Sequence, residues 1–530
     1  MSTTYDAVIV GAGHNGLVCG AYLARAGRKV CVLERRALIG GASVTEEVWP
    51  GFKVSTAAYT MALLQPRIIL ELELARYGFE VLTATPMFQP LEGDGYLTFY
   101  PDMARTCSGI ARYSPKDAEA YPRYRKHMLA VAEVVRRLLW EIPPDPVPRD
   151  PAGILGLLRF AWRYRNIGER FYDVYDLMTL SAYDLLSRWF ESEELKAALG
   201  FYAAGGGANS GMKSPGSAYV LLRGFVRDHE TAAGGPGFIR GGMGTISDAI
   251  ARSGREHGME IRTDAAVASI AMENGRATGA VLESGETVSG RTVISNANAQ
   301  TTFLKLVEPR ALPGEFLSEV RKMRIESTSF KVHLGLRRLP TFRHFDAAEQ
   351  GFEYPAQVRI GPSVDYIEQA YDDSKYGRFS RRPVMTVMTP SVVDPTLAPP
   401  GMHLISIFAQ HAPYSLRGRN WDDARDDLYE TVLATFAEFA PDIRDCIVHS
   451  QTLTPLDYER IFDLPHGHIH HGELSADQIF FQRPVRKFGG HATPIADLYL
   501  CGASTHPGGG VTGVPGHNAA QVVLRRLGRR

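Results

Sequence analysis

The chain has few cysteines and no excess of charge of either sign. Its five cysteines, scattered along 530 residues, form no C-x-x-C pair. This spacing excludes a disulfide framework, a zinc site built on cysteine pairs and a redox-active dithiol. Lysine plus arginine and aspartate plus glutamate both number 58, so the formal net charge is zero. A nucleic-acid-binding protein usually carries a basic excess, and we therefore expect no nucleic-acid partner.

Membrane-spanning runs and targeting segments are also missing. The uncharged stretch Leu498–Leu524 contains glycines, prolines and histidines that exclude a membrane-spanning helix. An apolar run already begins at Tyr5, which leaves no room for a signal or transit peptide. We therefore expect a cytoplasmic protein. With 45% hydrophobic and 22% charged residues, the chain has the composition of a globular enzyme of two or three lobes.

The N-terminal residues predict a strand, a glycine turn and a helix. The apolar run YDAVIV at Tyr5–Val10 is typical of a buried parallel strand. The G-x-G-x-x-G turn of Gly11, Gly13 and Gly16 follows it, and an alanine-rich helix comes next. In a dinucleotide site these glycines allow the tight turn, the approach of a pyrophosphate and close helix–strand packing. The N–H groups at the start of the helix then bind the diphosphate.

An acidic residue ends the second predicted strand, KVCVL at Lys29–Leu33. At this position the carboxylate of Glu34 accepts both ribose hydroxyls and repels the 2′-phosphate of NADP. The motif therefore favours FAD or NAD over NADP. It continues as E-x-R-x-x-x-G-G, with Arg36 followed by the pair Gly40 and Gly41.

Two C-terminal motifs complete the pattern. The stretch DLYLCGASTHPGGGVTG contains Gly502, Gly510, Val511 and Gly513 and leads into a helix that starts near Gly516. The second motif, G-x-I-x-x-G-E-x-S-x-D-Q-x-F-x-x-R-P, lies within residues 467–484. Together with the N-terminal unit, these motifs resemble the phytoene desaturase-like FAD-dependent oxidoreductases of the carotenoid desaturase and amine oxidase superfamily. The 467–484 motif is similar to the corresponding motif of the branch called pyridine nucleotide-disulfide oxidoreductase domain-containing protein 2.

This resemblance implies FAD as the cofactor and a role for each motif. Gly40 and Gly41 would wrap the pyrophosphate, with Arg36 as a cationic partner. Many amine oxidases have an arginine after this glycine pair, whereas this chain has Ala42. The backbone of Val267 would read the adenine, and Gly502 would pass the ribityl chain. The helix start after Gly510, Val511 and Gly513 would face the N1 and C2=O edge of the flavin, where the positive dipole end stabilises negative charge.

The fold implied is α/β, with a Rossmann-type FAD-binding domain and an inserted substrate domain of mixed β-sheet plus helices. We expect the discontinuous FAD-binding domain at residues 1–65, 237–300 and 486–530. The substrate-binding and lid domain is expected at residues 66–236 and 301–485.

Two residues are candidates for catalysis. Lys331 lies in an alternating strand, STSFKVHLGL, next to His333 on one face. In amine oxidases a strand lysine holds a water at flavin N5; the alternative is a solvated or salt-bridged lysine. His506 either contacts the flavin or substrate or caps its turn. His466, His468 and His470 would share a face of a strand and bind a metal there, but a loop beside the cofactor is favoured, so no metal is expected.

A basic apolar segment follows the proline-rich connector at residues 143–151. Within Gly153–Arg170, one helical face carries Ile154, Leu157, Leu158, Ala161 and Trp162. Four arginines lie close by in the same segment. This composition is typical of a peripheral membrane contact. The alternative is a lid helix that packs on the core with its arginines in solvent.

The leading functional hypothesis is a desaturase or dehydrogenase that moves a hydride from a hydrophobic, polyene or lipid-like substrate onto flavin N5. No second dinucleotide motif exists for NADPH, so oxygen or quinone is the expected electron acceptor. Three alternatives stay open at this point: an FAD-dependent double-bond isomerase, an amine oxidase and a non-catalytic flavoprotein scaffold. If the protein forms an oligomer, we expect a homodimer.

Overall fold

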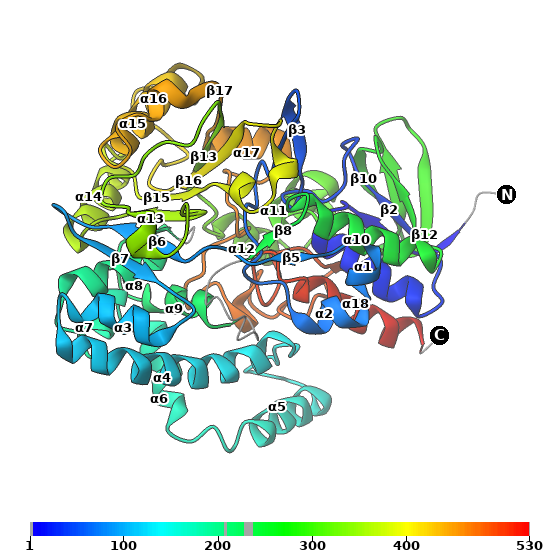
Figure 1. Cartoon of the computed structure of the whole chain (residues 1–530). Helices are drawn as coiled ribbons and strands as arrows, with labels where there is room; N and C mark the ends of the chain where they lie inside the picture. The colour runs from blue at the N-terminus through cyan, green and yellow to red at the C-terminus, as the bar shows by residue number, and fades with distance from the viewer. Residues whose placement is uncertain (1–3, 206–208, 227–236, 529–530) are drawn as a thin grey trace.

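Two seven-stranded sheets form the framework of the chain (Figure 1). The computed structural model describes residues 4–205, 209–226 and 237–528. The first sheet is built from both ends and the middle of the chain, and the second from the two stretches between them. The cores of the two sheets are separate, so each sheet has its own hydrophobic packing.

The first sheet has the strand order β10-β11-β12-β1-β2-β9, and β18 pairs with β12. Its strands are β1 (Tyr5–Val10), β2 (Val30–Leu33), β9 (Glu260–Arg262), β10 (Val267–Glu273), β11 (Arg276–Leu282), β12 (Thr287–Ser295) and β18 (Leu498–Leu500). Pairing from β18 through β12, β1 and β2 to β9 is parallel, whereas β10, β11 and β12 are antiparallel. Buried apolar runs such as β1 and β2 suit parallel strands that are covered on both faces.

Helices from three distant segments cover one face of this sheet. They are α1 (His14–Arg25), α10 (Gly244–Glu256) and α18 (Val514–Leu527). Ala7 and Ile9 of β1 belong to the same buried cluster as these helices. Val8 and Val10 point to the other face, where residues 303–325 pack. These residues follow the predicted boundary at 300 and yet pack on the first sheet.

The second sheet has the order β17-β13-β16-β15-β14-β6-β7. Its strands are β6 (Met87–Pro90), β7 (Tyr96–Phe99), β13 (Phe330–Leu336), β14 (Gln357–Ile360), β15 (Met385–Met388), β16 (His403–Ala409) and β17 (Ile447–Leu453). One face packs on α15 (Trp421–Ala437) through side chains that include Val332, Leu334 and Phe436. The predicted alternation of β13 is confirmed, because Phe330, Val332 and Leu334 belong to that core while Lys331 and His333 face the other way.

A helical region spans much of residues 103–224. It contains α3 (Met103–Ala111), α4 (Pro115–Leu139), α5 (Pro151–Arg163), α6 (Arg170–Thr179), α7 (Ala182–Ser187), α8 (Glu193–Gly205), α9 (Ala218–Leu221) and the 3-10 turn η2 (Leu222–Gly224). In Figure 1, α5 lies away from the body of the molecule at its lower edge. No residue of α5 is buried. Within the described residues, no helix is both long and apolar enough to cross a membrane.

The remaining elements are short and connect these layers. The strands are β3 (Glu46–Trp49), β4 (Phe52–Val54), β5 (Val81–Leu82) and β8 (Phe238–Ile239). The α-helices are α2 (Pro66–Glu71), α11 (Ala299–Thr301), α12 (Gly314–Lys322), α13 (Ala347–Gln350), α14 (Val364–Lys375), α16 (Ile443–Cys446) and α17 (Pro455–Phe462). The predicted domain boundary at 236 falls on residues outside the described ranges.

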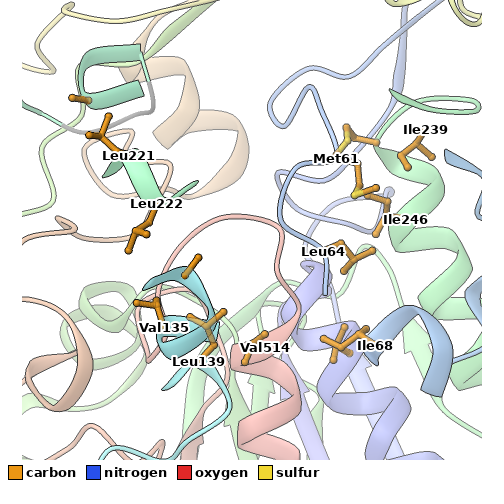
Figure 2. Packing of buried hydrophobic residues seen from close by; sticks show 14 of the residues in the cluster. Met61, Leu64, Ile68, Val135, Leu139, Leu221, Leu222, Ile239, Ile246 and Val514 are labelled. Atoms are coloured by element: carbon orange, nitrogen blue, oxygen red, sulfur yellow. The ribbon is translucent and has the colours of Figure 1, made fainter. Parts of the chain in front are cut away.

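The largest buried cluster joins the helical region to the first sheet. Figure 2 shows Leu139 of α4 beside Val514 at the start of α18, with Ile68 of α2 on the other side of Val514. These side chains are nearly or completely buried. The start of α18 is therefore held by hydrophobic contacts from two other segments of the chain.

Asp457 should stabilise the end of β17 and the start of α17. Its carboxylate accepts from Thr454 N–H and hydroxyl at 2.7 Å and from both Arg425 nitrogens at 2.6 and 3.0 Å. Asp457→Asn removes the charge and should lower the free energy of unfolding by about 1–3 kcal/mol, measured by urea denaturation. Exposed Asp426→Asn on the neighbouring helix is the control and should change it by less than about 0.5 kcal/mol. Equal changes in the free energy of unfolding for the two variants would contradict this role of Asp457.

Candidate cofactor and active site

The glycine turn and the distant glycine pair lie against each other. Gly11 has φ +95°, which allows the chain to turn sharply after β1. The Gly40 N–H donates to the Ala12 carbonyl at 2.8 Å, and Gly13 and Gly40 form a parallel bridge. A Cβ on Gly41 would lie 3.2 Å from Gly13 Cα. The two predicted phosphate-binding segments therefore form one backbone surface.

Asn296, which was not predicted as a site residue, packs at the centre of this surface. It follows β12, and its side-chain Nδ2 would lie 2.7 Å from a Cβ on Gly13. A Cβ on Gly502 would lie 2.5 Å from its carbonyl oxygen. Gly16 has no room for a side chain either, because its Cβ would collide with the Gly11 carbonyl. In the sequence, the one feature that could have indicated this role is that Asn296 is a polar residue directly after a buried strand.

The acidic end of β2 lies beside the predicted adenine position. Glu34 is 6% exposed, and its carboxylate accepts from the Ala12 N–H at 2.8 Å and the Arg36 N–H at 3.1 Å. The Ala265 N–H donates to the Glu34 carbonyl at 2.8 Å, which brings Val267, at the start of β10, close to this strand end. Glu34 and Val267 are more than two hundred residues apart in the sequence. The pairing of β2 with β9 and the turn before β10 bring them together.

Arg36 has one guanidinium nitrogen that could bind a cofactor oxygen. Its Nη2 donates to Glu46 at 2.5 Å, and the group lies 5.3 Å from the Phe462 ring centroid. Its Nη1 is buried and has no hydrogen-bond partner among the described residues. A buried donor without a partner is costly, so a phosphate or ribose oxygen at this point would stabilise it.

The C-terminal motif packs on the N-terminal one. Gly513 is the N-cap of α18 and has φ +74°, and Gly510 has φ +103°. A Cβ on Gly510 would lie 2.6 Å from the Leu63 side chain. At Gly516 a Cβ would collide with the Asn15 carbonyl of α1, so the first turns of α18 and α1 are in direct contact. Both ends of the chain therefore contribute to one site, as predicted for a bound FAD.

His14 lies beside these glycines. It is half-buried at the start of α1, and its surroundings include the backbone of Gly510. Gly510 and Val511 are also partly accessible. Burial lowers the pKa of His14 to about 4, so its ring is neutral and its unpartnered Nε2 can bond a cofactor atom. The residues present thus fit an FAD that extends from Glu34 to the start of α18.

Lys331 is neither solvated nor salt-bridged. It is fully buried, and its Nζ donates to the carbonyls of Ser55 at 2.7 Å and Ala57 at 3.2 Å. Burial holds the pKa of Lys331 well below its usual range. The Nζ also lies 5.3 Å from the Tyr59 ring centroid. The lysine therefore fixes the chain segment at residues 55–57, while its catalytic role stays a prediction.

His506 is held by the end of α4. Its Nε2 donates to the Leu138 carbonyl at 2.8 Å, and its ring lies 5.2 Å from that of Phe480. Burial lowers the pKa of His506 to about 3, so the ring is neutral. Its Nδ1 is buried and unpartnered within the described residues, which leaves an acceptor for a group outside the protein. A contact with flavin or substrate stays a prediction.

The histidines at 466, 468 and 470 lie on a loop. His470 Nε2 accepts from Arg223 at 2.9 Å, and His468 Nδ1 accepts from the His470 N–H at 3.1 Å. The described part of the chain contains no group of three or more side chains arranged to hold a metal. A Cβ on Gly509 would lie 2.6 Å from the His470 Cβ, so this loop borders the C-terminal glycine motif.

Arg483, which sequence reasoning left out of the site, organises that border. Its guanidinium is 1% exposed and donates to the carbonyls of Ala503 at 2.8 Å, His470 at 2.5 Å and Glu473 at 3.1 Å. Burial lowers the pKa of Arg483 to about 10, which keeps it charged at neutral pH. One cation thus joins the 467–484 motif to the segment after β18. In the sequence, the Arg–Pro pair that ends the 467–484 motif is the feature that could have indicated this role of Arg483.

The chain belongs to the family described as flavin containing amine oxidoreductase, which matches residues 16–524. It is an FAD-dependent oxidoreductase. Rat pyridine nucleotide-disulfide oxidoreductase domain-containing protein 2 is 39% identical over 99% of this chain and 94% of its own. A limonene dehydrogenase polypeptide of Castellaniella defragrans is 29% identical over 99% and 95%, and phytoene desaturase (lycopene-forming) of Pseudescherichia vulneris is 25% identical over 96% of each chain.

Solved structures agree with this assignment at the level of the fold. An oxidoreductase from Methanosarcina mazei has a TM-score of 0.61 at 18% identity, covering 98% of this chain and 99% of that one. Cyclohexylamine oxidase from Brevibacterium oxydans has a TM-score of 0.57 at 15% identity, covering 99% and 100%. The predicted fold class, cofactor and family resemblance are confirmed.

Gly16→Ala should abolish FAD binding. The added methyl group would collide with the Gly11 carbonyl and press on Asn296, which displaces the phosphate-binding turn. The purified variant should lack the flavin absorption of the parent protein. Gly156→Ala is the matched control, because a Cβ there meets nothing within 4 Å and α5 lies outside the site. A Gly16→Ala protein with stoichiometric flavin would contradict the site.

Proposed function

We propose that the chain dehydrogenates a hydrophobic substrate of the polyene or lipid type. The observation that carries this proposal is a row of side chains across the inner face of the second sheet. Strand register aligns them in the order Arg359, Thr386, Phe408, Lys331 and Leu453, which we call the inner row. Phe408 stacks on Tyr59 with ring centroids 4.8 Å apart, so the row faces the segment that follows the predicted phosphate-binding glycines.

The chemistry available beside this row favours hydride removal. The flavin, when bound, supplies the hydride acceptor, and the protein supplies position and exclusion of water. Burial holds the pKa of Lys331 well below its usual range and lowers that of His506 to about 3, so the His506 ring is neutral and is no proton donor to the substrate. Dehydrogenation transfers a hydride to the flavin and releases one proton to solvent, so it needs no proton donor and suits such surroundings. Two relatives support an apolar substrate, because one is a limonene dehydrogenase polypeptide and the other is a lycopene-forming phytoene desaturase.

An amine oxidase is the less favoured alternative. Substrate amines are ammonium ions at neutral pH, and a binding site for them is expected to be neutral or negative. The inner row, which meets Tyr59 at Phe408, instead carries the arginine Arg359. Like charges in a desolvated site repel, which disfavours binding of an ammonium substrate. The isomerase alternative shares the apolar substrate and is separated from dehydrogenation by experiment.

Anaerobic mixing should separate these alternatives. We expect a polyene or lipid substrate from a cell lipid extract to bleach the flavin absorption of the holoenzyme, because dehydrogenation leaves the flavin reduced. Admitting oxygen or a soluble quinone should restore the absorption and so identify the acceptor. Conversion of an extract component by pre-reduced enzyme alone would support isomerisation and sink the proposed reaction. An amine that bleaches the flavin would favour the oxidase.

We also propose that α5 and the start of α6 contact a membrane surface. Large apolar side chains are exposed here, namely Ile154, Leu155, Leu158, Trp162, Phe171 and Tyr172. Arg159, Arg165 and Arg170 are exposed in the same segment, and Arg165 lies 4.0 Å from the Trp162 ring centroid. Apolar residues flanked by arginines suit insertion between anionic headgroups. A route from the bilayer would deliver an apolar substrate to the enzyme.

Loss of the apolar surface of α5 should abolish liposome binding. The triple variant Leu155→Ser, Leu158→Ser and Trp162→Ser should fail to sediment with vesicles that contain anionic lipid, whereas the parent protein should sediment. Its flavin content should not change, because no residue of α5 is buried. Leu70→Ser, at an exposed leucine of α2 outside this surface, is the control and should bind as the parent does. A parent protein that never sediments would remove the proposal.

A further inference from the structure

A large cleft lies between the helical region and the segments that cover the first sheet. Its volume is about 940 Å³, which lies within the range of about 300–1,000 Å³ for small-molecule sites. The walls come from the end of α6, residues 209–220, residues 300–326 and residues 466–477, and we call the last of these the 466–477 wall. None of the five residues of the inner row lines this cleft. It is therefore a second candidate binding site, at a place where separate parts of the chain meet.

Aliphatic and thioether side chains form the inner lining of the cleft. Met178, Leu304 and Leu474 are half-buried, and Met323 and Ile325 are buried. Methionine side chains are flexible and polarizable, so they adapt to ligands of varied shape. A ligand with an apolar chain would remove the half-buried side chains from water, which is the driving force for its binding.

Charged side chains of both signs surround this lining, namely Arg321, Arg324, Glu326, Glu473 and Asp477. Arg324 donates to both carboxylate oxygens of Asp477 at 2.7 and 2.8 Å. Because arginines and carboxylates are mixed here, the cleft does not select an ion of one sign. The lining thus favours an uncharged apolar ligand.

The 466–477 wall is fixed in place by hydrogen bonds and stacking. The Arg324 N–H donates to Gln478 Oε1 at 2.7 Å, and the Gln478 amide donates to the Arg324 carbonyl at 3.0 Å. The Ser327 N–H donates to the His466 carbonyl at 3.1 Å, and the His466 ring stacks on that of Tyr414 with centroids 4.8 Å apart. The cleft is therefore formed before a ligand binds, which lowers the entropic cost of binding.

The same wall separates the cleft from the C-terminal glycine motif. A Cβ on Gly508 would lie 3.5 Å from the Leu474 side chain, and a Cβ on Gly509 would lie 2.3 Å from His470 Cα. Leu474 also lines the cleft. One residue thus lies between the cleft and the predicted flavin end of the cofactor site.

α6 connects the cleft with the proposed membrane surface. Phe171 and Tyr172 are exposed at the start of this helix, and Met178 lines the cleft near its end. A helix of 10 residues is about 15 Å long. The cleft therefore lies within about one helix length of the surface that we expect to contact lipid.

We propose that this cleft is the first binding site of the apolar substrate. An uncharged alkyl or polyene chain lies along Met178, Leu304 and Met323 before it reaches the flavin. That this chain is the substrate rests on the proposed function, whereas binding of an apolar chain in the cleft stands without it.

A fluorescent polyene tests binding without turnover. The probe is 1,6-diphenylhexatriene, which is uncharged and emits more strongly in apolar surroundings, and it is titrated into the holoenzyme. Met178→Glu and Leu304→Glu should each weaken its binding by about tenfold or more, because an unpaired carboxylate is costly to bury beside an apolar ligand. Flavin content should not change, since neither residue belongs to the cofactor site. Leu304→Gln serves as the test if Leu304→Glu does not fold.

Two controls locate the effect. Met402→Glu, at an accessible methionine outside the cleft, should bind the probe as the parent does. All titrations are repeated with the triple serine variant of α5 as the parent, so that the proposed membrane surface does not bind the probe. The difference between the cleft variants and their parent should persist there.

Kinetics then test the place of the cleft in the reaction. With a lipid extract as the reductant, the flavin of the two glutamate variants should bleach at least about tenfold more slowly at low extract concentration and approach the parent's rate at saturation. Dithionite reduces flavin without a substrate site, so it should bleach parent and variants at the same rate.

The proposal is overturned if the parent does not bind the probe, if the parent and both glutamate variants bind it equally, or if Met402→Glu weakens it as much. It is also overturned if the cleft variants bind the probe weakly and yet the extract bleaches them at the parent's rate, because the substrate would then bypass the cleft. If the cleft binds the probe as expected but no apolar compound ever bleaches the parent's flavin, the binding site stands and the proposed reaction fails.

Discussion

The parallel pairing of β1 with β12 is the constraint on which the rest of the structure depends. It aligns Val10 with Ser295 and so places Asn296 directly against the glycine turn. β18 then pairs with the other edge of β12, which brings Gly502 to the same residue. Three segments that are far apart in the sequence thereby form one backbone surface. Each close approach needs a glycine, because a Cβ at Gly13, Gly16 or Gly502 would meet an atom that this pairing holds in place.

The second sheet has one apolar face and one face that contacts the cofactor-binding half of the chain. Its outer face is apolar and packs on α15, so the inner face is free to carry polar residues. Lys331 and His333 bind backbone carbonyls of residues 55–57 and so hold this sheet against the segment that follows the glycine pair. A buried side chain that donates to main-chain carbonyls recurs at Arg483, which joins the 467–484 motif to Ala503. At each of these contacts a long buried side chain donates hydrogen bonds to main-chain oxygens of a distant segment.

Some site residues could be predicted from the sequence and others could not, for physical reasons. Gly11, Gly13, Gly16 and Glu34 lie in one short unit whose roles follow from local geometry, so a cofactor site could be predicted without knowledge of the fold. The alternation of Lys331 and His333 was also predictable, since strand period places neighbours on opposite faces. Arg359 and Asn296 carry no such pattern. They become site residues only through contacts with segments more than a hundred residues away.

The sequence by itself determined the cofactor, because an FAD site is built from backbone N–H groups and a carboxylate whose spacing is fixed along the chain. The tertiary structure decided which side chains form the proposed substrate surface. The inner row crosses four strand pairings, and its members are adjacent only because the sheet aligns them. Arg359 of the sheet likewise meets Tyr202 of α8 through packing, and no local motif in the sequence indicates this contact.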